Sequence, residues 1–399
     1  MLRKAVNCSH HTNCLAKQTS LPPAILNFWK ENMNRYFIEA PGFTAQRDRF
    51  IEAARAVGAE LAEFEHPMRG PRREMLATDV AVIGDPLAPK RFIVVSGTHG
   101  IEGYYGSESQ IAFLYSMQKR ALPADVCVVM VHLINPWGTA WLRRVNEDNV
   151  DLNRNYVAFN EALPDNARYE AFHSIYLCCD LDGPARRRAD ERMAEEIKRL
   201  GLATVMSIVE AGQYAHADGI FFGGQHATWS NRTLRAIAKR FMEGAHTAMC
   251  FDLHTGAGAF GHAMLMAVAQ QSYPALAKSQ SVFGPWLYTV ITGPAATTDS
   301  GIAATATGYT SQALVDALPG MDLMQLVIEC GTYDGIRGHR ALRDDHWLHL
   351  YGDPEDETGR RIKAALAEHF YPADQDWREL TQLRTRQIFE RGLRALQAA

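Results

Sequence analysis

The segment RFIVVSGTHGIEGYYG, residues 91–106, joins a short apolar run to a glycine-rich turn. The run at residues 92–95 is rich in β-branched side chains and stops at Ser96-Gly97, which predicts a buried strand that ends in a turn. His99 and Glu102 follow directly, among glycines that let the backbone fold tightly. We therefore expect an imidazole and a carboxylate to point at one spot beyond the end of this strand.

A histidine and a carboxylate just after the end of a strand are residue types that commonly bind a zinc ion. With 15 histidines in the chain, about one H-x-x-E pair is expected by chance. The pair alone is therefore also compatible with a glycine-rich turn and a solvated glutamate. A phosphate-binding loop is a weaker interpretation, because the segment lacks G-K-[ST] and its glycine spacing matches neither nucleotide-binding fingerprint.

The composition is that of an ordinary globular protein: 399 residues, 47% hydrophobic and 22% charged, with a formal net charge of −4. This charge gives no reason to expect a nucleic-acid partner or an anionic membrane. No apolar run approaches the length of a transmembrane helix. Seven cysteines without paired spacing indicate free thiols in a reducing compartment, so we expect a cytoplasmic protein.

The length is compatible with one large α/β domain that carries insertions. Residues 1–33 are polar and basic, lack the apolar core of a signal peptide, and are predicted to be a disordered leader; a transit peptide or a start codon placed too early would also explain them. We expect residues 34–399 to form a single domain. It would contain a long insertion at about residues 157–245 and a helical tail from about residue 357.

Several other segments carry a clear secondary-structure pattern. Helices are predicted at residues 45–57, 107–121, 184–200 and 234–241, and two further helices in the tail. Two short strands, 60–66 and 78–83, precede the first apolar strand; apolar strands are predicted at 126–134, 248–253, 287–291 and 323–328. Unbroken apolar strands alternating with helices predict a doubly wound α/β fold, with a mixed, mostly parallel sheet covered by helices on both faces.

Residue types that carry chemistry gather just after the predicted apolar strands. His99 and Glu102 follow the first of these strands, the turn at Asn135 follows the second, and His254 and Glu329 follow two others. In open α/β sheets, ligands bind at the edge formed by the carboxyl ends of the strands. Several such groups on one edge are much harder to obtain by chance than one H-x-x-E pair, so we expect a functional site there.

With these residues in this order along the sequence, the chain resembles the zinc carboxypeptidase superfamily. This is the carboxypeptidase A-like (phosphorylase/hydrolase-like) fold, which also includes aspartoacylase and succinylglutamate desuccinylase. The resemblance spans about residues 92–335. Three segments, GTHGIEG, GQY-x-H-x-DG and DLHTG, are most similar to a bacterial branch known mainly as a domain of unknown function. The motifs that carry the resemblance are His99-x-x-Glu102, Asn135-Pro136, Arg144, Asp151-Leu152-Asn153-Arg154, His254 and Glu329.

The resemblance implies a zinc hydrolase that cleaves an amide or peptide bond next to a free carboxylate. His99, Glu102 and His254 would be the zinc ligands, which leaves a fourth position for water. Asp151 would orient the first histidine, and Glu329 would be the general base. Alternatively, His254 is a polar residue that caps its strand, and Glu329 forms a salt bridge to a nearby arginine.

The resemblance also implies the groups that would bind substrate, a small peptide or an N-acyl amino acid. Arg144 would stabilise the oxyanion, with Arg143 as the second candidate. Asn153 and Arg154 would bind the free carboxylate, because an arginine can grip both oxygens. A solvated basic turn is the alternative for these arginines. The weaker candidates for lining the pocket are Gln213, His216 and Tyr309.

Some features depart from the family. His254 comes later than in carboxypeptidase A-like enzymes because of the insertion at 157–245, which we expect to roof the cleft. We find no C-terminal β-domain like that of the aspartoacylase branch, which argues against the substrates of that branch. A catalytically inactive binding protein on the same fold is an alternative. A serine or cysteine hydrolase is not supported, since G-x-S-x-G is absent and no cysteine has a known nucleophile context.

Overall fold

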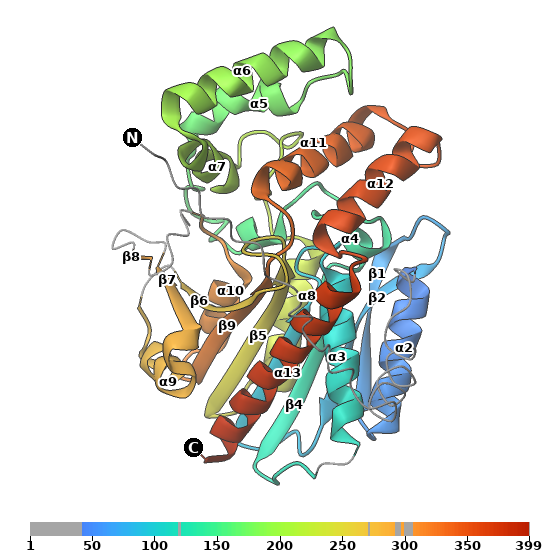
Figure 1. Cartoon of the computed structure of the whole chain (residues 1–399). Coiled ribbons are helices and arrows are strands. Elements are labelled where there is room, and N and C mark those ends of the chain that lie inside the picture. Colours follow the sequence, from blue (N-terminus) through green and yellow to red (C-terminus); the bar gives the residue numbers. More distant parts are fainter. Residues whose placement is uncertain (1–41, 119–120, 270–271, 292–296, 299–305, 399) are drawn as a thin grey trace, which may run out of the picture. The chain divides into compact units, whose positions relative to one another are not determined.

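A nine-stranded mixed sheet runs through the computed structural model (Figure 1), which describes residues 42–118, 121–269, 272–291, 297–298 and 306–398. The described residues all belong to one unit of the chain, Ala40–Ala399. The predicted leader at residues 1–33 lies outside them. The strands are β1 Glu60–Arg69, β2 Met75–Ile83, β3 Lys90–Ser96, β4 Val126–His132, β5 Thr247–Thr255, β6 Ala263–Ala269, β7 Leu287–Ile291, β8 Thr297–Thr298 and β9 Asp322–Cys330.

The strand order is β1-β2-β4-β3-β5-β9-β6-β7-β8. The four central strands β4, β3, β5 and β9 are parallel to one another. The antiparallel pairs are β1 with β2, β2 with β4, β9 with β6 and β7 with β8, while β6 and β7 are parallel. All seven residues of β4 are buried, as expected for a parallel strand covered on both faces. The predicted α/β fold with a mixed sheet is confirmed.

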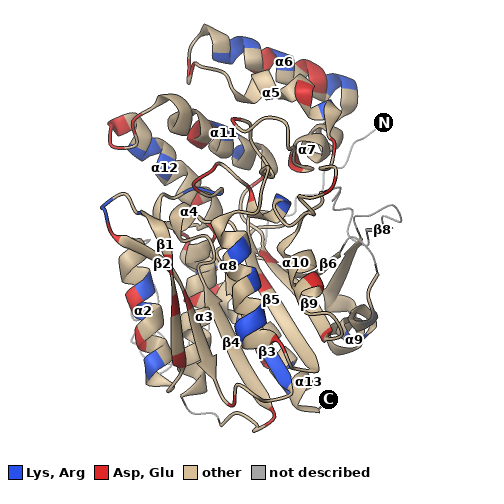
Figure 2. Cartoon of the chain, turned by 180° about the vertical axis from the view of Figure 1, so that it is seen from behind, with Lys and Arg blue, Asp and Glu red and all other residues tan. Residues whose placement is uncertain are grey.

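Helices cover both faces of this sheet and form two separate hydrophobic cores. On one face Phe92 and Phe251 pack against Phe389, and the helices are α2 Phe43–Ala56, α3 Gly103–Met117, α9 Pro274–Phe283 and α13 Gln375–Ala398. On the other face, which is turned to the viewer in Figure 2, Ile93 and Cys250 belong to the second core together with residues of three helical segments. These are α8 Trp229–Ile237, the π-helical turn Ala238–Met242 and α10 Thr310–Ala317.

The insertion at 157–245 has its own small hydrophobic core, which includes Phe172, Val205 and Ile208. In Figure 1 its helices lie on the same side of the sheet as α11 Gly335–Tyr351. The helices around this small core are the turn Ala167–Tyr169, α5 Glu170–Tyr176, α6 Pro184–Leu200 and α7 Leu202–Glu210. The last part of the 157–245 range, α8 and the π-helical turn, packs on the sheet instead. The tail consists of α12 Glu357–Phe370 and α13, which confirms the two predicted tail helices.

Other boundaries differ from the prediction. The helix expected at 107–121 begins at Gly103 and ends at Met117, and the helix expected at 234–241 is α8 followed by the π-helical turn. Strand β6 and helix α11 were not predicted. The Ala- and Met-rich β6 has only one β-branched residue, Val268. In α11 the apolar periodicity is hidden, because its buried face also carries Arg343 and Asp345.

None of the helices in the described part of the chain combines the length and the apolar character needed to span a bilayer. The five cysteines in this part are free thiols: Cys127, Cys178, Cys179, Cys250 and Cys330. The other two, Cys8 and Cys14, precede the described residues.

Candidate active site

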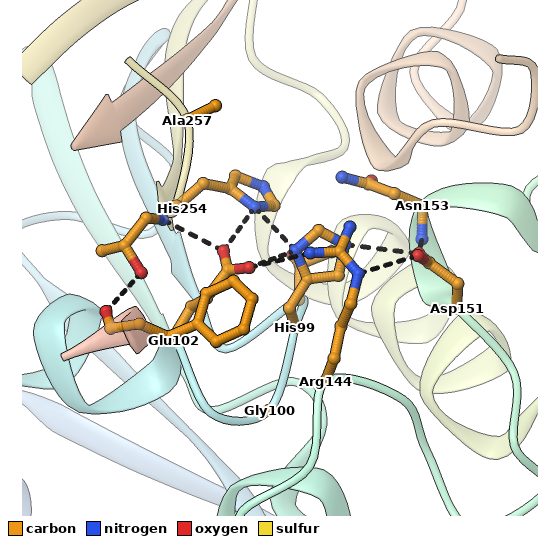
Figure 3. Close-up of polar contacts among 12 residues, drawn as sticks. His99, Gly100, Glu102, Arg144, Asp151, Asn153, His254 and Ala257 are labelled. Carbon is orange, nitrogen blue, oxygen red and sulfur yellow. Dashed lines mark hydrogen bonds and ion pairs between the residues drawn. The ribbon is translucent and has the colours of Figure 1, made fainter. Parts of the chain in front are cut away.

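The three predicted metal ligands lie together at the carboxyl ends of β3 and β5. His99 follows β3, Glu102 immediately precedes α3, and His254 is the next-to-last residue of β5. His99 Nδ1 lies 2.9 Å from Glu102 Oε1 and 3.2 Å from His254 Nδ1, and His254 Nδ1 lies 3.1 Å from Glu102 Oε2. All three side chains are buried, and they converge on one point (Figure 3). We refer to them as the ligand cluster.

The spacing of the ligand cluster fits a zinc ion. Zinc forms bonds of about 2.0–2.1 Å to imidazole nitrogen and carboxylate oxygen, so two ligand atoms of a tetrahedral site are about 3.3 Å apart. The distances of 2.9–3.2 Å between the donor atoms are close to this value. Two imidazoles and one carboxylate are also a ligand set of catalytic zinc sites, which keep one position open.

The outer nitrogen of each histidine faces a carboxylate. His99 Nε2 lies 3.2 Å from Asp151 Oδ1, and His254 Nε2 lies 3.0 Å from Asp252 Oδ2. Asp252 is further held by Thr98, whose hydroxyl donates to Oδ1 at 2.9 Å. Such contacts leave Nδ1 free to bind a metal and fix the orientation of the ring. Asp151 thus contacts His99, the histidine that it was predicted to orient. The contact of Asp252 was not predicted, although its i, i+2 spacing from His254 on one strand places both on one face.

The charge of the site also favours a cation. The carboxyl groups of Glu102, Asp151 and Asp252 contact the two histidines, and one arginine, Arg144, contacts Glu102 and Asp151. Burial alone would raise the pKa of the Glu102 carboxyl, but His99 and His254 outweigh burial and hold this pKa below its usual range. Glu102 is therefore an ionised carboxylate inside the protein, which is the form that binds a metal ion.

Arg144 lies against the ligand cluster. Its Nη1 donates to Glu102 Oε1 at 3.0 Å, its Nε donates to Asp151 Oδ2 at 3.0 Å, and its Nη2 lies 2.8 Å from His99 Nε2. Burial would lower the pKa of this guanidinium, but Asp151 and Glu102 raise it above its ordinary value, so the cation is permanent. A fixed positive charge thus lies at the ligand cluster.

Glu329 lies at the end of β9, where its Cα is in register with that of His254 on β5. Its Oε1 accepts a hydrogen bond of 2.9 Å from the backbone N–H of Ala257. Burial, together with the negative charge of Glu102, raises the pKa of Glu329 to about 7. A carboxylate with this pKa can both take up and release a proton near neutral pH.

The turn that carries His99 and Glu102 depends on a close backbone approach at Gly100. A Cβ atom at this position would lie 2.1 Å from the carbonyl carbon of Gly138 and 2.4 Å from the backbone nitrogen of Thr139. The backbone N–H of Gly100 also donates to the carbonyl oxygen of Arg144 at 3.0 Å. Glycine is therefore required here because the segment around Arg144 is packed directly on this turn.

We expect Gly100→Ala to destabilise the protein, because two backbone segments would have to separate. Overpacking of this kind costs about 1–3 kcal/mol, and more where backbone cannot yield. Urea unfolding should show this loss. Gly335→Ala is the matched control, since no atom lies within 4 Å of a Cβ at that position, and we expect a change within about 0.5 kcal/mol. Equal stability of the two variants would contradict the close approach.

Arg154 and Tyr309, two predicted substrate-binding residues, lie side by side, with the guanidinium carbon of Arg154 5.5 Å from the centre of the tyrosine ring. Arg154 donates from Nε and Nη2 to the carbonyl oxygen of Glu210 and from Nη1 to that of Asn153. Because arginine has five N–H groups, one on each Nη remains beyond these three bonds. Arg154 can thus still donate twice to a carboxylate.

Asn153 uses its Oδ1 to accept hydrogen bonds from the backbone N–H of Thr310 at 3.0 Å and from its hydroxyl at 2.7 Å. These bonds fix the orientation of the amide, whose nitrogen points toward the side of His254 (Figure 3). The backbone N–H of Asn153 donates to Asp151 Oδ1 at 2.9 Å. The predicted pair of Asn153 and Arg154 is therefore joined to the ligand cluster through Asp151.

The structure places three other candidates away from the cluster. Arg143 is buried and its Nε donates to Asp345 Oδ2 at 3.0 Å. The side chain of Gln213 binds its own loop, accepting from the N–H of His216 at 2.7 Å. His216 Nε2 lies 2.7 Å from Glu170 Oε2. Arg143 thus joins its loop to α11, and of these two neighbouring arginines only Arg144 contacts the ligand cluster.

A loop of the insertion, residues 212–224, packs against Arg144 and Asp151. The ring of Phe221 lies 5.5 Å from the guanidinium carbon of Arg144, and the carbonyl oxygen of Phe222 accepts from the N–H of Asp151 at 2.8 Å. Phe221 has a positive φ of 52°, which is rare for a bulky residue. Residues of this loop therefore contact the candidate site directly.

Solved structures with similar folds include carboxypeptidase A from Helicoverpa armigera (12% identity, TM-score 0.41, covering 80% of this chain and 71% of that chain). Thrombin activatable fibrinolysis inhibitor is similar at 11% identity and TM-score 0.44, covering 84% and 75%. An aspartoacylase family protein from Mesorhizobium loti is similar at 12% identity and TM-score 0.35, covering 75% and 68%. These identities are too low to transfer an activity. No curated protein sequence matches the chain significantly.

The family described as "Protein of unknown function (DUF2817)" matches residues 40–383. This range includes the ligand cluster, Glu329 and the insertion. A branch known as a domain of unknown function was predicted from the sequence motifs, and that prediction is confirmed. Since the match spans most of the chain, the protein belongs to the DUF2817 family.

Proposed function

We propose that this protein is a zinc-dependent hydrolase that cleaves an amide or peptide bond next to a free carboxylate. The observation that carries the proposal is the ligand cluster itself: two imidazole nitrogens and a carboxylate, all buried, lie 2.9–3.2 Å apart. His99, Glu102 and His254 would hold the ion. When bound, zinc supplies Lewis-acid polarisation and lowers the pKa of water to about 7.

Glu329 would act as the general base. One of its oxygens is held by the N–H of Ala257, which leaves the other to take a proton from the attacking water. The same oxygen can then give this proton to the leaving nitrogen. Positioned acid-base groups contribute about 10²–10⁴-fold to a rate. Burial beside Glu102 raises the pKa of Glu329 to about 7, so both transfers are feasible near neutral pH.

Arg144 would stabilise the negative charge that develops on the carbonyl oxygen of the substrate. Its guanidinium is held by Asp151 and Glu102, so its position is fixed before the reaction, which is the requirement for electrostatic stabilisation. Asn153 and Arg154 would bind the free carboxylate of the substrate, and Tyr309 would lie beside it. A carboxylate bound there would place the neighbouring amide toward the ligand cluster.

A substrate screen tests the proposal. The full chain, treated with a chelator and then with zinc, should be assayed against C-terminal dipeptides and against N-acyl amino acids. We expect hydrolysis that is lost with the chelator and restored by zinc. Faster hydrolysis of the dipeptides would indicate a carboxypeptidase, and faster hydrolysis of the N-acyl amino acids would indicate a deacylase. Zinc binding without turnover of any substrate would favour the inactive binding protein.

Carboxylate recognition by Arg154 gives a further prediction. Amidating the substrate and replacing Arg154 by alanine should each lower kcat/KM by about 30–1000-fold, since losing one partner of a buried charge pair costs about 2–4 kcal/mol. In Arg154→Ala, amidation should have little further effect, because both changes remove the same interaction. Arg188→Ala, an exposed arginine on α6, is the control. If amide and acid are cleaved equally by the unaltered protein, Arg154 does not read a carboxylate.

A further inference from the structure

We propose that the insertion binds a second divalent transition-metal ion through His173, His216 and Asp218. His173 lies on α5, and His216 and Asp218 lie in the loop at residues 212–224. Their possible ligand atoms all lie within 4.8 Å of one another. This second cluster shares no residue with the ligand cluster, so the inference does not depend on the proposed hydrolase.

The two imidazoles of the second cluster are stacked, with ring centres 3.8 Å apart and an angle of 21° between the ring planes. A carboxylate approaches each ring: Asp218 Oδ1 lies 3.6 Å from His173 Nε2, and Glu170 Oε2 lies 2.7 Å from His216 Nε2. Two imidazoles with one or two carboxylates are a common ligand set for zinc and its neighbours. Glu170 contacts His216 but is not one of the three clustered residues.

The backbone that carries His216 is held rigidly. Gln213 Oε1 accepts hydrogen bonds from the N–H groups of Ala215 at 3.0 Å and His216 at 2.7 Å, and Gln213 Nε2 donates to the carbonyl oxygen of His216 at 2.7 Å. The oxygen and the nitrogen of the Gln213 amide thus form three hydrogen bonds to backbone groups of Ala215 and His216, which fixes the loop around His216. Such preorganisation lowers the entropic cost of binding an ion.

His173 presents one nitrogen to the cluster and buries the other. A Cβ atom at Gly219 would lie 3.3 Å from His173 Nδ1, so this nitrogen faces the loop backbone while Nε2 faces Asp218. The side chain of Asp218 is 59% exposed, so it can move the short distance needed to join the two histidines.

An ion here would connect the insertion to the candidate active site. The same loop places Phe221 beside Arg144 and gives the carbonyl oxygen of Phe222 to Asp151. In addition, the hydroxyl of Tyr214 donates to the carbonyl oxygen of Arg154. A metal bridge between α5 and this loop would thus hold the roof in place over the groups proposed to bind substrate.

Metal titration of the full chain tests the assignment. In His99→Ala/His254→Ala, which lacks the ligand cluster, Zn²⁺ or Co²⁺ should still bind with one equivalent per chain and raise Tm. Adding His216→Ala should abolish both effects. Asp218→Asn, which keeps the shape of an exposed side chain, should weaken binding at least about tenfold. His226→Ala, an exposed histidine of the same insertion, should leave binding unchanged.

The outcomes separate this proposal from the proposed function. If His99→Ala/His254→Ala binds no ion, or if His216→Ala and Asp218→Asn bind as tightly as their parent, the second cluster is a hydrogen-bonded network without a metal. If the unaltered chain and His99→Ala/His254→Ala both bind one ion that His216→Ala removes, the second site stands and the ligand cluster fails. Two equivalents in the unaltered chain, each removed by its own variant, support both.

Discussion

Replacing Glu329 by glutamine is expected to lower kcat by about 10²-fold or more, with normal folding and near-normal zinc content. Glutamine keeps the shape of the side chain and can still accept the hydrogen bond from Ala257, but it cannot take a proton. General acid-base groups contribute about 10²–10⁴-fold, and a group that acts in the transition state affects kcat more than KM. Steady-state kinetics with the substrate found in the screen, together with metal analysis, would measure this effect.

Asp322→Asn is a matched control for this variant. Asp322 lies at the opposite end of the same strand, β9, where it pairs with Lys278 at the surface, about 20 Å away at the usual rise per residue. We expect its kcat to stay close to that of the unaltered protein. Activity of Glu329→Gln within a few-fold of normal would rule out the general base. Loss of zinc would instead make Glu329 a ligand and reopen the role of Glu102.

Replacing His99 or His254 by alanine is expected to remove one zinc equivalent per chain and all hydrolytic activity. Loss of a residue that only orients a ligand costs about 10–100-fold in metal affinity, so loss of a ligand should exceed this. Removing one imidazole also leaves Glu102 buried with fewer partners, which destabilises the site further. Metal analysis after dialysis, with zinc added back to each variant, would measure the loss.

His246→Ala is the control for His254, because His246 is an exposed histidine that directly precedes the same strand, β5. It should retain both zinc and activity. Should both His99→Ala and His254→Ala keep all of their zinc, the ligand cluster would not be a metal site. Circular dichroism would show whether either variant loses its fold, in which case Glu102→Gln provides a more conservative test of the same cluster.

The central strands could be predicted because their signal is local. The run at residues 92–95 and the segment of β4 are uninterrupted apolar sequences, and strands buried on both faces need such sequences whatever their neighbours are. The order of β3, β5 and β9 in the sheet depends on crossovers, yet the carboxyl ends of parallel strands meet at one edge in any order. The meeting of His99, Glu102 and His254 was therefore already implied by the sequence.

Partners of polar side chains depend on contacts between distant segments. The sequence places Arg143 and Arg144 next to each other, but only the packing of α11 turns Arg143 toward Asp345 and leaves Arg144 to Glu102 and Asp151. Local periodicity contains no information about such pairs. For the same reason strand β6 and helix α11 were missed, since their stability comes from tertiary contacts that override a weak local pattern.

By itself the sequence determined the central strands, the edge at which their carboxyl ends meet and the residue types gathered there, because apolar runs and strand ends are read from neighbouring residues. Only the tertiary structure decided which nitrogen of each histidine faces the ligand cluster, that Asp252 backs His254, and that His216 lies against His173. The physical reason is that each of these contacts depends on the direction of a side chain, which is set by packing between segments far apart in the chain.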